Sequence, residues 1–176
     1  MTDTVIRIPS LQTERLILRA PAPRDYDAFC AFRRSPRSAG IGGPFPQDGA
    51  FTGFAALIGH WHLRGFGRWI VAGRDNDEPL GIVGPFFPDD WPEPEIAWSL
   101  FDGAEGRGIA QEAAIAARAF AYKVLGWTTA MSAIMAGNQR SVALAKRLGC
   151  TPDGSFEHPA FGTLEIWRHP FVQEAV

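Results

Sequence analysis

A glycine-rich run that leads directly into an alanine-rich stretch constrains the fold of this chain most strongly. Residues 105–110 read Glu-Gly-Arg-Gly-Ile-Ala, and residues 111–125 favour a helix because six of them are alanine. Glycine permits a left-handed backbone and close approach of a ligand, and the first helical turn presents unpaired N–H groups and the positive end of the helix dipole. The run therefore predicts a site for an anion such as a phosphate group. The alternative is an ordinary loop before a core helix, because Gly-x-Gly alone is a short pattern.

The segments on either side predict strands and helices in alternation. Residues 95–101 alternate in polarity as a strand does, and Asp102-Gly103 marks the end of that strand. Residues 128–135 read as another strand, and a second helix begins at 138–141 and ends at Gly149. The resulting unit is strand, helix, strand, helix.

Four sets of residues carry a resemblance to a known family: 106–110 with Glu112-Ala113, Asn138-x-x-Ser141, the run 146–149, and residues 11–19 followed by Asp25. In this order they resemble the GNAT superfamily of acyl-CoA N-acyltransferases. The N-terminal set resembles the RimJ/RimL-type branch, whose named members acetylate the N-termini of ribosomal proteins. Together the sets cover nearly the whole chain. The fold that the resemblance implies is α/β, with a mostly antiparallel sheet of about six or seven strands, about four helices, and a splay between the fourth and fifth strands.

The rest of the chain is predicted from its pattern and its Pro and Gly positions. Residues 35–48 carry three prolines and three glycines, too many for a regular element, and are expected to form a loop. The remaining expected strands are 13–19, 67–74, 79–87, 151–157 and 163–168, and the remaining helices are 25–34 and about 50–63.

Composition predicts one domain spanning residues 1–176. The chain is 46% hydrophobic with 13 Phe and 6 Trp, which suffices for a core without metal or disulfide support. A formal charge of -2 without a Lys or Arg run argues against nucleic acid as a partner. No apolar run approaches the roughly 20 residues that span a bilayer, no signal peptide opens the chain, and Cys30 and Cys150 lack metal-ligand spacing. We expect a cytoplasmic protein, monomer or homodimer, with no metal and no membrane partner.

The resemblance implies acetyl-CoA as cosubstrate. Its pyrophosphate is expected on the backbone N–H groups of residues 105–110, its pantetheine along the strand of residues 95–101, and its acyl carbon at the fork beside residues 128–135. The implied binding residues are Trp98, Ser99, Leu100, Glu105, Gly106, Arg107, Gly108, Ile109, Ala110, Asn138 and Ser141.

Two residues are the candidates for catalysis. Glu95, at the start of its strand, is the expected base that removes a proton from the acceptor amine, directly or through water. The alternative for Glu95 is a solvated strand-end carboxylate beside Glu93. Ser141 is expected to protonate or hydrogen-bond the departing thiolate, whereas the alternative is an ordinary residue near a helix start that Asn138 caps. Many superfamily members carry a tyrosine acid at the position of Ala145, so tyrosine catalysis is not expected.

The charged residues around the glycine run could either contact the phosphates of the ligand or face solvent. Glu105 stands where many superfamily members have Gln or Arg, and its carboxylate repels a pyrophosphate unless it turns outward or Arg107 compensates. Arg107 is equally well explained as a solvent-facing cation. The cations Arg140, Lys146 and Arg147 fit either a 3′-phosphate contact or a solvated helix face.

Large aromatic residues are the candidates for an acceptor pocket, although most are expected in the core. Residues 85–92 are expected to form an exposed connection, and His60 and His62 to be structural or exposed because no third metal ligand accompanies them. The aromatic candidates are Trp61, Trp69, Phe86, Phe87, Trp91 and Trp98.

These expectations combine into an N-acetyltransferase. An acetyl group would pass from acetyl-CoA to a primary amine by direct attack through a tetrahedral intermediate, with a protein or peptide N-terminus as the leading acceptor by branch resemblance. A small amine, an amino acid or an antibiotic is the alternative acceptor, and a catalytically silent acyl-CoA sensor is the alternative class. A nucleotide-binding domain is disfavoured because the loop lacks the Gly-Lys-Ser/Thr ending of a P-loop.

Overall fold

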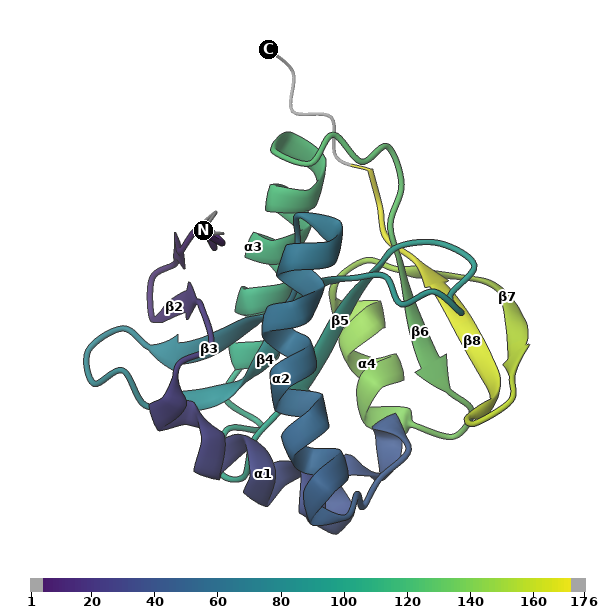
Figure 1. The fold of residues 1–176 in the computed structure, drawn as a ribbon. Helices are drawn as coiled ribbons and strands as arrows, with labels where there is room; N and C mark the ends of the chain where they lie inside the picture. Colours follow the sequence, from purple (N-terminus) through teal and green to yellow (C-terminus); the bar gives the residue numbers. More distant parts are fainter. Residues whose placement is uncertain (1–4, 172–176) are drawn as a thin grey trace.

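An eight-stranded sheet runs through the molecule in the order β1-β2-β3-β4-β5-β6-β8-β7, in a computed structural model that describes residues 5–171 (Figure 1). Neighbouring strands are antiparallel except β5 and β6, which run parallel. The mostly antiparallel α/β sheet is therefore confirmed. The strands are β1 Leu11–Gln12, β2 Leu16–Arg19, β3 Trp69–Gly73, β4 Pro79–Phe86, β5 Glu95–Leu100, β6 Met131–Met135, β7 Thr151–His158 and β8 Gly162–Arg168.

Helices cover both faces of this sheet, and Figure 1 shows α2 in front of the central strands. Side chains that alternate along a strand point to opposite faces. Ile70 and Ile82 pack with residues of α1 and α2, whereas Val71 and Val83 pack with residues of α3 and α4. The helices are η1 Pro23–Asp25, α1 Tyr26–Arg34, η2 Pro36–Ile41, α2 Gln47–Arg64, α3 Ile109–Lys123 and α4 Gln139–Arg147.

The structure differs from the sequence prediction in two elements. Residues 35–48 were expected to be a loop, but they include η2, where Pro36 presets the first helical position and Ser35 accepts a hydrogen bond from the Arg37 N–H. The sheet has eight strands because the two-residue β1 pairs with β2 at its edge, Leu11 opposite Leu18. The fourth and fifth strands of the prediction are consequently β5 and β6.

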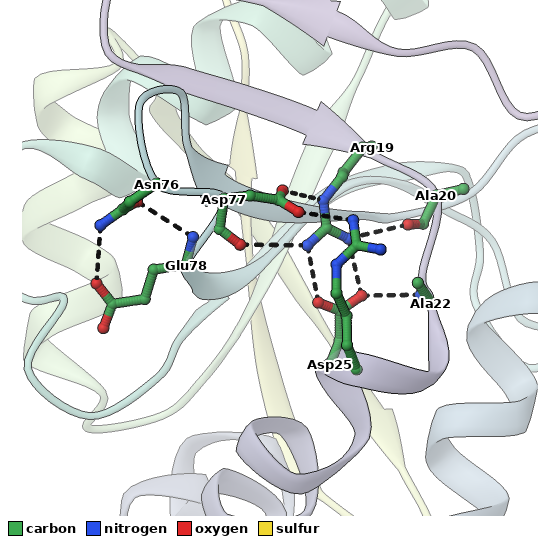
Figure 2. A network of polar contacts seen from close by, with 8 residues as sticks. Arg19, Ala20, Ala22, Asp25, Asn76, Asp77 and Glu78 are labelled. Carbon is green, nitrogen blue, oxygen red and sulfur yellow. Dashed lines mark hydrogen bonds and ion pairs between the residues drawn. The ribbon is translucent and has the colours of Figure 1, made fainter.

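A buried ion pair fixes the start of α1 against the sheet (Figure 2). Both terminal nitrogens of Arg19 donate to the Asp25 carboxylate at 2.8 Å, and Arg19 Nε donates to Asp77 in the β3–β4 turn at 2.5 Å. The side-chain hydrogen bond to Asp25 raises the pKa of Arg19, and the hydrogen bond from Arg19 lowers the pKa of Asp77. This network joins β2, the α1 start and the β3–β4 turn, and so sets where α1 lies on the sheet.

Candidate active site

The parallel strands β5 and β6 separate after a single paired position, Glu95 opposite Met131. Side chains bridge the two strands there: the Ala133 N–H donates to Glu95 Oε2 at 2.8 Å, and Ser132 Oγ donates to the Ile96 carbonyl at 2.6 Å. In a continuous sheet backbone groups would fill these positions. The predicted splay is therefore confirmed, and the fork opens toward the carboxyl ends of both strands.

A buried histidine supports the closed end of the fork. The Ser132 hydroxyl proton goes to the Ile96 carbonyl, so His169 Nε2, 2.9 Å from Ser132 Oγ, is the protonated nitrogen. His169 Nδ1 then faces Arg118 at 3.4 Å as an acceptor. Burial, together with the charges of Arg118 and Arg168, lowers the pKa of His169 to about 3. His169 is accordingly neutral at physiological pH and acts as a structural link, which the sequence did not predict.

Glu95 lies at the base of the fork with only 5% of its surface exposed. One carboxylate oxygen accepts from the Ala133 N–H, and the other accepts from Trp91 Nε1 at 2.9 Å. Burial raises the pKa of Glu95 to about 7, although these hydrogen bonds and the charge of Arg68 oppose the shift. The alternative of a solvated strand-end carboxylate is therefore wrong, and the group changes charge near neutral pH.

The glycine turn before α3 has the backbone that the sequence predicted. Gly106 and Gly108 adopt positive φ angles of 73° and 76°, and a Cβ added at Gly106 would meet no atom within 4 Å. The helix begins at Ile109, two residues earlier than expected, with Gly108 as its N-cap. The N–H groups of its first turn have no partner within the helix. An approachable backbone followed by these N–H groups suits a diphosphate.

Residues near the N-terminus hold this turn in place. Glu112, in the first turn of α3, accepts from Thr13 Oγ1 at 2.5 Å and from Arg15 Nε at 2.7 Å. The same Arg15 donates to the Arg107 carbonyl at 2.9 Å. Burial raises the pKa of Glu112, but the hydrogen bonds from Thr13 and Arg15 outweigh it and lower the pKa. The motif at residues 11–19 signalled the branch resemblance, but its contact with the turn was not foreseen.

Two arginines neutralise the carboxylate of Glu105 beside the turn. Arg37 NH2 lies 2.7 Å from Glu105 Oε1, and Arg140 NH1 lies 3.2 Å from the same oxygen. Arg37, in η2, is a partner that the sequence did not predict. Arg107 is exposed, and within residues 5–171 its side chain forms no ion pair. The negative charge next to the turn is thus balanced by Arg37 and Arg140 rather than by Arg107.

The predicted residues of the pantetheine channel divide between the two faces of the sheet. Trp98 and Leu100 pack on the α3 and α4 side, and Ser99 is buried on the side of α1 and α2. Trp98 Nε1 donates to Ser141 Oγ at 3.3 Å, while Asn138 Oδ1 accepts from the Ser141 N–H at 3.2 Å and caps α4. The structure therefore brings Trp98 and Ser141 together across the fork and leaves the Ser141 hydroxyl proton available.

Most of the aromatic candidates have structural positions. Trp61 and Trp69 pack in the core with ring centroids 5.1 Å apart, as expected for most of the set. His60 is structural as predicted, since it bonds the Phe66 carbonyl at 2.7 Å and the Phe87 N–H at 2.9 Å.

Part of the expected exposed connection at residues 85–92 is buried, which corrects that prediction. Pro85 and Phe86 belong to β4, and Pro85 is buried. Trp91 packs against Phe86 and Phe161 at centroid distances of 6.1 and 6.0 Å. Aromatic side chains therefore form a wall beside the Glu95 carboxylate.

Two further classes of site were sought in the part of the chain that the structure describes. Residues 5–171 contain no group of three His, Cys, Asp or Glu side chains placed to hold a metal ion. None of the helices in the same range combines the length and the apolar character needed to cross a bilayer.

Comparison with known proteins identifies the family. The model of the acetyltransferase (GNAT) domain matches residues 15–151. An acetyltransferase from Agrobacterium tumefaciens str. C58 is 35% identical, with a TM-score of 0.86 and a match that covers 97% of this chain and 99% of the other.

Two more distant structures share the fold. A ribosomal-protein-S5-alanine acetyltransferase from Vibrio fischeri is 14% identical with a TM-score of 0.68, covering 93% of this chain and 97% of the other. RimL, a ribosomal L7/L12 α-N-protein acetyltransferase in complex with coenzyme A, is 16% identical with a TM-score of 0.70, covering 89% and 94%. At these identities the two neighbours show that the fold is shared. The match to the acetyltransferase (GNAT) domain covers more than half of this chain, and the chain therefore belongs to the GNAT acetyltransferase family.

Proposed function

We propose that this protein transfers an acetyl group from acetyl-CoA to a primary amine at the β5–β6 fork. The observation that carries the proposal is the placement of two candidate groups on opposite faces of one strand. In β5 the Glu95 side chain lies on the face covered by α1 and α2, whereas Trp98, bonded to Ser141, lies on the face covered by α3 and α4. Acetyl-CoA would enter from the α3 and α4 side, and the amine from the other.

Glu95 would remove the proton from the acceptor amine. Amines are protonated in water near neutral pH and become nucleophilic only after losing that proton. A carboxyl group whose pKa is about 7 accepts a proton far more readily than one with the usual pKa of about 4.5. The hydrogen bonds from Trp91 and Ala133 keep the carboxylate at the fork.

Ser141 would donate a hydrogen bond to the sulfur that leaves with CoA. Its oxygen already accepts from Trp98 Nε1, which turns the hydroxyl proton toward another acceptor. Developing negative charge on the sulfur would strengthen that bond. The amides of residues 106–110 would meanwhile hold the diphosphate and fix the reach of the thioester arm.

The acceptor that we propose is a protein or peptide N-terminus. Support for it comes from the RimJ/RimL-type motif at residues 11–19 and from neighbours whose names describe ribosomal-protein acetyltransferases. A small amine is the second candidate acceptor.

An amine panel tests the proposal. The purified protein is mixed with acetyl-CoA and with peptides or small amines, and released CoA thiol is followed over time. We expect thiol release that depends on both substrates and an acetylated amine detected by mass spectrometry. Acetyl-CoA binding by calorimetry without thiol release from any amine would instead identify a silent acyl-CoA sensor.

A further inference from the structure

Two arginine side chains on the α1 and α2 side of the sheet have no carboxylate within 4.0 Å among the residues that the structure describes. Arg68 immediately precedes β3, and its guanidinium carbon lies 4.1 Å from the centroid of the Phe86 ring. Arg33, in the last turn of α1, lies 3.4 Å from the Phe45 ring centroid. Within residues 5–171 neither forms an ion pair at 4.0 Å or less. Both cations therefore rest on aromatic rings, and Glu95 acts on Arg68 only from beyond ion-pair distance.

These cations lie on the same face as the proposed base. Phe86, under Arg68, is directly opposite Glu95 in the β4–β5 ladder. Arg68 is two residues before Ile70, which packs with Phe29 of α1, so alternation turns Arg68 toward α1 as well. The three charges also act on one another, since Glu95 raises the pKa of Arg68 and Arg33 lowers it.

Burial makes the missing partner costly. Arg33 Nε is buried and has no hydrogen-bond partner, and burial lowers the pKa of Arg33. Burial also lowers the pKa of Arg68 to about 10. A charge removed from water is destabilising unless an opposite charge or hydrogen bonds compensate. Carboxylates lie within 4.0 Å of the guanidiniums of Arg19, Arg37 and Arg168, whereas the half-buried Arg118 donates to the Leu148 carbonyl.

We propose that the amine acceptor carries a carboxylate, which Arg33 and Arg68 bind while the amine faces Glu95. This inference rests on the proposed acetyl transfer and names the class of its acceptor. The charges are complementary: the ammonium group of the acceptor meets the Glu95 carboxylate, and its carboxylate meets two guanidiniums. Two guanidiniums on the same face of the sheet as Glu95 repel polycationic amines such as aminoglycoside-like compounds.

The carboxylate has two chemical sources, and matched acceptors separate them. The first pair is a free amino acid and its amide, which differ only at the α-carboxylate. The second pair is a peptide amide that begins with Asp or Glu and the same peptide that begins with Asn or Gln. We expect kcat/KM to be at least about 10-fold higher for the acidic member of one pair, as a charge-assisted hydrogen bond provides. Equal rates within both pairs would overturn the inference but leave acetyl transfer intact.

Variants assign the preference to the two arginines. Arg33→Gln and Arg68→Gln should each lower kcat/KM for the acidic acceptor about 10- to 100-fold more than for the neutral acceptor. Arg34→Gln removes the same charge from the exposed neighbour of Arg33 and is the matched control. Equal losses on both acceptors would mean that the arginines serve the fold or Glu95 only, which contradicts the inference.

Product binding provides a readout without turnover. Calorimetry in the presence of CoA should show tighter binding of the acetylated acidic product than of its neutral counterpart, and Arg68→Gln should abolish the difference. Arg68→Lys keeps the positive charge and should therefore retain part of the difference in affinity between the two products. Thermal melting and acetyl-CoA affinity confirm that each variant is folded. Thiol release from no amine would refute the proposed function, whereas equal affinity of the two products would refute the carboxylate site.

Discussion

Glu95 combines burial, two hydrogen bonds and a position at the strand fork. Its carboxylate replaces a backbone partner of Ala133, so the residue that would move a proton also links β5 to β6. The raised pKa follows chiefly from burial. A base with a pKa near 7 is ionised in roughly half of the molecules at neutral pH, so the rate should depend on pH in that region.

The first prediction concerns the pH dependence of kcat/KM for the acceptor. Since the base must be ionised, activity should fall as pH decreases through about 7, and Glu95→Gln should lose about 100-fold in kcat together with that limb of the profile. Steady-state kinetics from pH 5.5 to 9, by thiol release, measure both effects. Glu93→Gln, two residues away and bonded to Arg168, is the control and should keep the wild-type profile. If the pH profile of Glu95→Gln were unchanged, Glu95 would not be the base.

At the residue scale, the sequence indicated candidate residues better than it indicated the side chains that contact them. Glu95 was a candidate from its strand position, and Ser141 and the turn glycines from their motifs, whereas Arg37 and Arg68 were not candidates. Arg37 meets Glu105 across 68 residues of sequence, and no local pattern reports such a contact. A guanidinium stacked on an aromatic ring likewise leaves no periodic signal. A loop arginine looks the same in the sequence whether or not its side chain contacts a ring.

At the scale of elements, the glycine turn and the first turn of α3 form the proposed diphosphate site, which has its own charge balance. Glu105 is held by Arg37 and Arg140 on one side of the turn, and Arg15 holds the Arg107 carbonyl on another. The carboxylate of Glu105 thus occupies two cations that stand close to the expected diphosphate. A substitution that removes the Glu105 charge should therefore change the electrostatic potential at the turn.

Glu105→Gln should lower the KM for acetyl-CoA about 2- to 5-fold. The substitution removes a negative charge and frees Arg37 and Arg140 to face the diphosphate, a gain comparable to that of an exposed ion pair. The KM for acetyl-CoA is measured from thiol release at low and high salt, and high salt should reduce the difference between the variant and the wild type. Glu78→Gln, exposed in the β3–β4 turn, controls for net charge. A higher KM in Glu105→Gln would show that the carboxylate orders the turn instead.

Gly108→Ala should weaken acetyl-CoA binding and lower stability by about 1–2 kcal/mol. The positive φ of 76° strains any other residue, and the added Cβ would lie 3.3 Å from Arg15 NH2, which helps to hold the turn. Gly103→Ala has nearly the same φ of 74° with no atom within 4 Å, so it is the matched control for strain alone. Urea unfolding and calorimetry should show similar stability losses but weaker binding only in Gly108→Ala. Equal affinities of the two variants for acetyl-CoA would show that the turn at Gly108 does not bind this ligand.

Most elements were predictable because their signals are local. Alternating polarity, alanine content and stop glycines located the central strands and α3, with boundary errors of a few residues. The two elements that were missed, β1 and η2, lack such signals. β1 has only two residues and exists because β2 offers it an edge, and η2 occupies a run whose prolines and glycines usually break helices.

For the whole molecule, the sheet separates the two proposed binding faces, which meet at the fork. Helices α3 and α4 bound the face with the glycine turn, and α1 and α2 bound the face with Glu95, Arg33 and Arg68. The position of α1 therefore matters for the acceptor side, and the Arg19, Asp25 and Asp77 network sets that position (Figure 2).

Asp25→Asn should destabilise the whole fold by about 3 kcal/mol. It leaves Asp77 as the one carboxylate partner of the buried Arg19 guanidinium among the described residues, and a buried charge that loses a neutralising partner is costly. Urea unfolding measures the free energy. Asp27→Asn, exposed in the first turn of α1, should change stability by less than about 0.5 kcal/mol. A loss in Asp25→Asn no larger than in this control would show that the network does not anchor α1.

A crystal structure of the acetyl-CoA complex tests the central claim most directly. The account predicts the diphosphate on the backbone amides of residues 106–110 and the thioester between β5 and β6, with its sulfur near Ser141 and its acetyl carbon on the side of Glu95. A diphosphate bound away from this turn, or a thioester arm that does not enter the fork, would contradict it.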